Sequence, residues 1–145
     1  MGTVSIKGVL IGGTVDVVSS FILGIPFEIY ILAKVNLAHT PPNQISSALA
    51  ATHASLPVHL GGAVVGVLCS VPGGYVAARV AGHSELLNGT LASWLCVLIA
   101  IYAMMSGKSD HPLFVQILLL AASPALGCLG GYLKLRQSHA LSAPV

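Results

Sequence analysis

GVLIGGTVDVVSSFILGIPFEIYILA, residues 8–33, is an apolar run that contains two acidic residues, Asp16 and Glu28. At about 1.5 Å of rise per residue, a helix over this run is roughly 39 Å long, whereas the hydrocarbon core of a bilayer is about 30 Å thick. An aspartate near the bilayer centre costs about 2.5–3.5 kcal/mol, and each large apolar residue contributes about 0.3–0.6 kcal/mol in favour of insertion. The apolar residues outweigh the acids, so the run predicts a membrane span.

The composition of the whole chain agrees with this prediction. Its 145 residues are 55% hydrophobic and 7% charged, and the mean hydropathy is +0.90, whereas about a quarter of the residues of soluble proteins are charged. The formal charge of +2 is too small, and the basic residues too scattered, for nucleic acid binding. We therefore expect one integral membrane domain over residues 1–136, in contact with the lipid bilayer, and a disordered tail over residues 137–145.

Four apolar segments predict an all-α fold, a four-helix membrane bundle. The predicted spans are residues 8–33, 57–82, 86–105 and 113–135. The loop over residues 34–56 is expected to carry a short helix at the membrane surface. Four of the six Lys and Arg residues are predicted to lie on the same side of the membrane as the amino terminus. Because basic residues are in excess on the cytoplasmic side of membrane proteins, both termini are predicted to be cytoplasmic.

Small residues recur at every fourth position in the first two spans. In lipid, close backbone approach through small residues is the main source of helix association, so these two helices are predicted to be the tightest pair. Leucine in place of Gly12 or Gly66 is then expected to damage the fold more than at Val97, which is predicted to face lipid. The predicted helix-packing residues are Gly8, Gly12, Ser20 and Gly24 in the first span and Gly62, Gly66, Ser70 and Gly74 in the second.

The second and fourth spans end in the same pattern. Residues 73–79 read GGYVAAR and residues 130–136 read GGYLKLR. The match indicates either two helical hairpins of one ancestry or a chance likeness. In both places the glycines allow close approach of a neighbour, the tyrosine hydroxyl suits the headgroup region, and the arginine can reach the membrane surface.

Over GGYVAARVAG, residues 73–82, and the Leu86-Leu87-Asn88-Gly89 that follows, the sequence resembles a group of small four-span bacterial inner-membrane proteins of unknown function. In that group a GGY-x-AAR-x-AG element ends the second helix, and a Leu-Leu-x-Gly start opens the third. The resemblance implies the four-span fold and a multi-pass location in the bacterial inner (plasma) membrane. It implies no catalytic residue.

Asp16 is the deeper of the two acids in the first span. Counted inward from the cytoplasmic ends, Asp16, Tyr75 and Ser93 lie at about the same depth, and the repeat brings Tyr132 near that level. We predict that Asp16 faces inward and accepts hydrogen bonds from these hydroxyl groups or pairs with Arg79. The candidate intramembrane polar site is therefore Asp16, Tyr75, Ser93, Tyr132 and Arg79, with Glu28 as a secondary candidate.

The sequence has no pattern typical of catalysis or of a bound cofactor. It lacks a nucleophile elbow, a phosphate-binding loop and an HExxH motif, so neither an enzyme nor a cofactor is expected. The three cysteines lie within predicted spans without metal-ligand spacing. Histidines and an aspartate on the predicted outer side have zinc-compatible chemistry but no ligand pattern, so no metal is expected; these residues are His39, His53, His59, Asp110 and His111.

Two functions remain open. The first is a structural or assembly role, in which the bundle associates with itself or with other membrane proteins. The alternative is a small proton- or cation-coupled transporter or channel that uses Asp16, because acids inside a membrane commonly mark ion pathways. Four spans are too few to enclose a path alone, so this alternative requires an oligomer.

Overall fold

The structure, a computed structural model, describes residues 3–35, 39–106 and 113–142. The regular structure in these ranges is helical, which confirms the predicted all-α class. The elements are α1 (Ile6–Val35), the 3-10 helix η1 (Pro42–Gln44), α2 (Ile45–His53), α3 (Leu56–Ala81), α4 (Glu85–Ala92), α5 (Trp94–Met105) and α6 (Leu113–Ser142).

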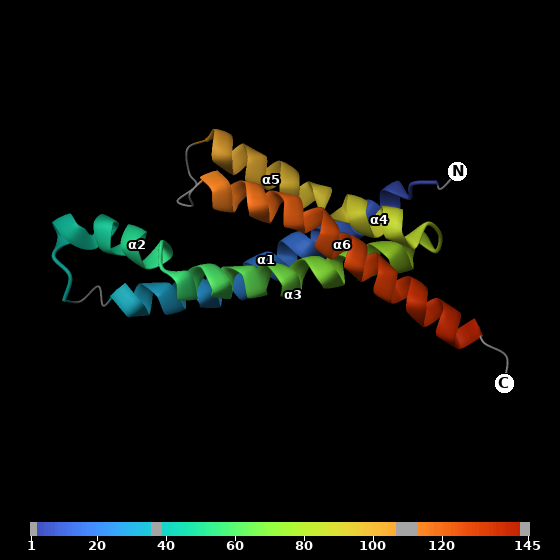
Figure 1. The fold of residues 1–145 in the computed structure, drawn as a ribbon, viewed down its shortest axis with the longest axis horizontal. Helices are drawn as coiled ribbons and strands as arrows, with labels where there is room; N and C mark the ends of the chain where they lie inside the picture. The colour runs from blue at the N-terminus through green and yellow to red at the C-terminus, as the bar shows by residue number, and fades with distance from the viewer. Residues whose placement is uncertain (1–2, 36–38, 107–112, 143–145) are drawn as a thin grey trace.

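Among the described residues, three helical segments are long and apolar enough to cross a membrane: Ile6–Val35, Leu56–Ala81 and Glu85–Tyr102. The fourth predicted span lies within the 30-residue helix α6, whose first side chains fall outside the described part of the chain. Figure 1 places both chain ends at the same end of the molecule. The predicted short helix after the first span is present as α2.

Local sequence sets the ends of α3. Pro57 lies in the first turn, where the missing N–H of proline leaves no helical hydrogen bond unmade. Gly82 ends the helix in the left-handed conformation, with φ 67°, and its N–H donates to the carbonyl of Ala78 at 3.1 Å. Each of the three long helices α1, α3 and α6 continues unbroken through one internal proline.

The third predicted span, residues 86–105, is divided at Ser93 into α4 and α5. Ser93 has φ −71° and ψ −15°, and its carbonyl still accepts the N–H of Val97 at 3.1 Å, so one helix follows the other without a loop. Val97 is only 5% exposed, so the prediction that it faces lipid is wrong.

The helices α1 and α3 form the most extensive pair of the bundle, as predicted. Their backbones come close enough to exclude side chains. A Cβ atom on Gly12 would lie 2.6 Å from the carbonyl oxygen of Gly73, and one on Gly8 would lie 2.8 Å from that of Ala77. These distances are shorter than real Cβ atoms tolerate, so the contact requires glycine.

The predicted row of small residues leaves this contact along both helices. Gly24 and Gly66 have no atom within 4 Å of a Cβ position, and Gly62 has a single ring carbon at 4.0 Å. Gly74 contacts Gly127 of α6 instead of α1. A row of every fourth residue drifts by about 40° per step on a helix of 3.6 residues per turn, so the predicted row does not stay on the α1–α3 contact at these positions, and at Gly74 it serves a second neighbour.

The helix α6 crosses α3 and α4 through its own glycines. A Cβ atom on Gly130 would lie 2.6 Å from the backbone nitrogen of Tyr75, and one on Gly131 would lie 2.5 Å from the carbonyl oxygen of Glu85. Figure 1 shows α6 passing over α3 and continuing past the other helices to the carboxyl terminus. We call this contact the glycine crossing; its residues are Gly74, Gly89, Gly127, Gly130 and Gly131.

The carboxyl-terminal end of α6 extends further than predicted. The helix continues to Ser142, so the prediction of a disordered tail is wrong for residues 137–142. These residues include good helix formers and no glycine or proline, and the helix ends just before the residue that precedes Pro144. Residues 143–145 lie outside the described part of the chain.

We predict that Gly12→Leu lowers the free energy of unfolding by about 3 kcal/mol or more, because the added side chain forces the α1 and α3 backbones apart. Gly66→Leu is the matched control, since its Cβ position is open, and it is expected to leave stability unchanged or slightly raised. Thermal unfolding of the monomeric protein in detergent, followed by circular dichroism, measures both. Equal losses for the two variants would contradict the helix contact described above.

Candidate intramembrane polar site

Asp16 lies in the contact between α1 and α3 and is only 1% exposed. The hydroxyl group of Ser70 donates to its Oδ1 atom at 3.3 Å. A Cβ atom on Gly73 would lie 2.7 Å from the Cβ atom of Asp16, so the glycine makes room for the acid. The carboxyl group is thus enclosed between two helices, as the prediction that it faces inward requires.

Two thiols also lie beside the carboxyl group. Cys96 of α5 is within hydrogen-bond reach of the carboxyl group, and Cys69 of α3 is near enough to interact with its charge. The Oδ2 atom of Asp16 accepts no hydrogen bond from any described residue. We call Asp16, Cys69, Ser70 and Cys96 the Asp16 cluster. Chemically, this arrangement can fix the helices in register through a hydrogen bond, or hold a proton or a small cation on the second oxygen.

The other predicted members of the site lie elsewhere. The hydroxyl of Tyr75 donates to Gln137 Oε1 on α6. Ser93 is fully buried, but its Oγ atom is directed at Gly127 and has no hydrogen-bond partner among the described residues. Tyr132 is 49% exposed, and Arg79 is exposed near the end of α3. Equal depth therefore does not bring these side chains together, because they point from different faces of their helices.

The partners that Asp16 has in the structure are not among the predicted site residues. Ser70 was predicted only as a packing residue, and Cys69 and Cys96 were given no role. The available signal was the position of Ser70 and Cys69 about one turn before Gly73, where a small residue lets another helix approach. Ser20, a further predicted packing residue, donates its hydroxyl to the backbone carbonyl of Asp16 at 2.8 Å.

Asn88 is a further fully buried polar residue. Its Oδ1 atom accepts the backbone N–H of Ser5 at 2.8 Å, and its Nδ2 atom donates to the carbonyl groups of His83 at 2.9 Å and Ser84 at 3.1 Å. The hydroxyl of Ser5 in turn accepts the N–H of Gly8 at 3.1 Å. One amide side chain therefore ties the start of α1 to the turn between α3 and α4.

Glu28 belongs to a different part of the molecule. Its carboxylate lies 3.7 Å from Nε2 of His53 and is 57% exposed, so it joins α1 to α2 at the surface. Lys34, one to two turns further along α1, lies over the ring of Tyr30 at 5.5 Å from its centroid. The secondary candidate is thus a surface contact, separate from the Asp16 cluster.

The described residues contain no group of three or more His, Cys, Asp or Glu side chains arranged to hold a metal ion. Asp110 and His111, named above for their zinc-compatible chemistry, lie outside the described part of the chain.

No protein-family model, curated protein or solved structure matches the chain.

We predict that Asn88→Ala lowers the free energy of unfolding by about 1–3 kcal/mol, because it leaves the part-buried N–H of Ser5 and the carbonyl of His83 without their partner, while the Ser84 carbonyl still accepts the backbone N–H of residue 88. Thr90→Ala is the matched control two residues away, since the hydroxyl of Thr90 bonds only to its own helix at Leu86. It is expected to cost less than about 1 kcal/mol. Hydrogen exchange at Ser5 should rise in Asn88→Ala alone, and unchanged protection there would argue against the link between α1 and α4.

Proposed function

We propose that this chain is a four-span protein of the bacterial inner membrane with a structural role, forming a compact bundle that assembles with copies of itself or with other membrane proteins. Three segments that can cross a membrane, the 30-residue helix α6 and the placement of both chain ends at one end of the molecule support the four-span arrangement. Both termini are cytoplasmic in this proposal. It includes no enzymatic activity and no cofactor.

The observation that carries the structural role is the position of Asp16. Its carboxyl group is enclosed at the α1–α3 contact, opposite Gly73, and is bonded to Ser70. A polar group so placed can pair in only one register of the two helices, because any sliding would leave it unpartnered in an apolar surrounding. In this proposal the acid therefore fixes the register of α1 against α3.

The outer faces of α1 and α3 support association with a second copy. Gly24 and Gly66 have open space over their Cβ positions, and large apolar side chains around them are exposed, among them Phe21, Ile25 and Val67. In lipid, open small residues among larger ones allow another helix backbone to approach. We assign this face to self-association.

A specific observation favours the alternative of a proton- or cation-coupled transporter or channel. The Oδ2 atom of Asp16 lacks a hydrogen-bond donor among the described residues, and acids inside a membrane commonly bind the transported ion. In this alternative, self-association of the chain also encloses the path.

Asp16→Asn separates the two functions. Because the amide oxygen still accepts from Ser70, we expect the variant to keep its stability and its association, while Asp16→Leu loses about 1–3 kcal/mol by leaving the Ser70 hydroxyl unpartnered. Thermal unfolding and crosslinking in vesicles measure these properties. A proton or cation flux present in wild-type vesicles and absent from Asp16→Asn vesicles, with assembly intact, would favour transport instead.

For the assembly face, we predict that Gly24→Leu combined with Gly66→Leu reduces self-association in vesicles at least tenfold, since the new side chains occupy the space for the second backbone. Ala100→Leu, at an exposed position of α5, is the control and should leave association unchanged. Single-molecule photobleaching of labelled protein measures the oligomer distribution. Equal association in all three proteins would place the contact on another face.

A further inference from the structure

The two GGY-x-x-x-Arg motifs lie against each other in the structure. Gly130 of the second motif is so close to the first that a Cβ atom on it would lie 2.6 Å from the backbone nitrogen of Tyr75 and 3.0 Å from the carbonyl carbon of Gly74. Both motifs therefore pass through the glycine crossing, and the residues that follow their glycines continue toward the end of the molecule that holds both termini (Figure 1). The two copies of the motif thus form one contact between α3 and α6.

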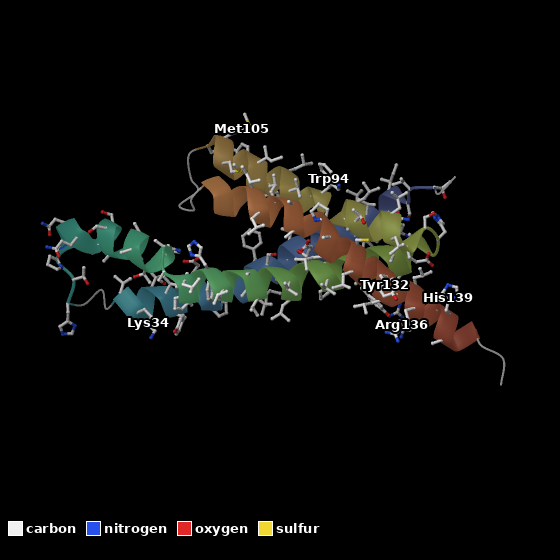
Figure 2. The ribbon with its side chains drawn as sticks, viewed as in Figure 1. Lys34, Trp94, Met105, Tyr132, Arg136 and His139 are labelled. Atoms are coloured by element: carbon white, nitrogen blue, oxygen red, sulfur yellow. The ribbon has the colours of Figure 1, made fainter. Side chains whose placement is uncertain are left out.

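Beyond the crossing, a hydrogen bond holds the two motifs together. The hydroxyl of Tyr75 donates to Oε1 of Gln137. Arg79 follows Tyr75 by one helical turn on α3, and Arg136 is the neighbour of Gln137 on α6. Each arginine therefore lies within about one helical turn of the Tyr75–Gln137 contact between α3 and α6, which we call the joint. Figure 2 shows Tyr132, Arg136 and His139 along this end of α6.

Both arginines have charges available to a ligand. Each arginine side chain is exposed. In the described part of the chain, the ion pair between side chains is that of Glu28 with His53, on other helices, so it does not involve either arginine. Glu85, at the start of α4, is the acidic residue near this joint, and its contact with α6 is through its backbone carbonyl at Gly131. The joint thus carries an excess of positive charge.

We propose that Arg79 and Arg136 together bind the phosphate of an anionic phospholipid headgroup. A guanidinium group offers paired donors that match two phosphate oxygens, and basic sites between helices at the cytoplasmic membrane surface favour such headgroups. Arg79 lies in the last turn of an apolar segment able to cross a membrane. Val80 and Leu133 beside the joint are exposed and offer apolar surface to an acyl chain.

This proposal rests on the membrane placement proposed above, but not on the assembly role. The test is a titration of the full chain in neutral detergent with phosphatidylglycerol, followed by native mass spectrometry. We expect an apparent dissociation constant about fivefold weaker for Arg79→Gln or Arg136→Gln, and about 25-fold weaker for the double variant. Lys34→Gln, which removes a cation from the other end of α1, is the control and should bind as the wild type does.

Phosphatidylcholine and inorganic phosphate complete the test. Weak binding of both to the wild type supports a site for an anionic lipid, whereas inorganic phosphate that competes at equal concentration would show a site for free phosphate and overturn the proposal. Equal phosphatidylglycerol binding by the double variant and the wild type would also overturn it. Unchanged thermal unfolding of the lipid-free variants shows that the fold is intact. Membrane placement is checked separately by fractionation of cells that express the chain.

Discussion

The bundle depends on backbone-to-backbone contact at pairs of adjacent glycines. Adjacent residues of a helix point about 100° apart, so a Gly-Gly pair lets two different neighbours approach at one level. Gly73 faces α1 while Gly74 faces α6, and Gly130 faces α3 while Gly131 faces α4. In the same way, Gly12 faces α3, and the residue after it faces α4 and α5. Because lipid supplies no hydrophobic force between helices, these close approaches are what hold the bundle together.

The buried polar groups follow from this packing. Asp16 lies where Gly73 leaves room, and Ser93 lies where Gly127 leaves room. Each polar group then either finds a partner on the neighbouring helix, as Asp16 does in Ser70, or stays without one among the described residues, as the Ser93 hydroxyl does. The glycine contacts therefore decide both how closely the helices approach and which polar atoms lie in the contact. This explains why a buried polar residue lies opposite a glycine at each of these two contacts.

The sequence predicts the helices and the main helix pair because both depend on local composition: long apolar runs and dense small residues. It fails where the outcome depends on helix rotation. The rows of small residues that include Gly24 in α1 and Gly66 in α3 keep a fixed spacing in the sequence, but the rotation of each helix turns its row away from the contact. Likewise, the depth of Tyr75 could be counted along the chain, but its partner Gln137 belongs to a segment that is helical because α6 continues to Ser142. The members of the Asp16 cluster could not be predicted for the same reason, because the rotation of each helix decides which side chains face Asp16.

Asn88 gives the chain an order of events during synthesis. The amide that accepts the N–H of Ser5 is separated from it by 83 positions, so the first helix is made well before its start gains this partner. That hydrogen bond can form only after α3 and the first turn of α4 have been made, so the start of α1 gains a polar partner from a residue that is translated much later.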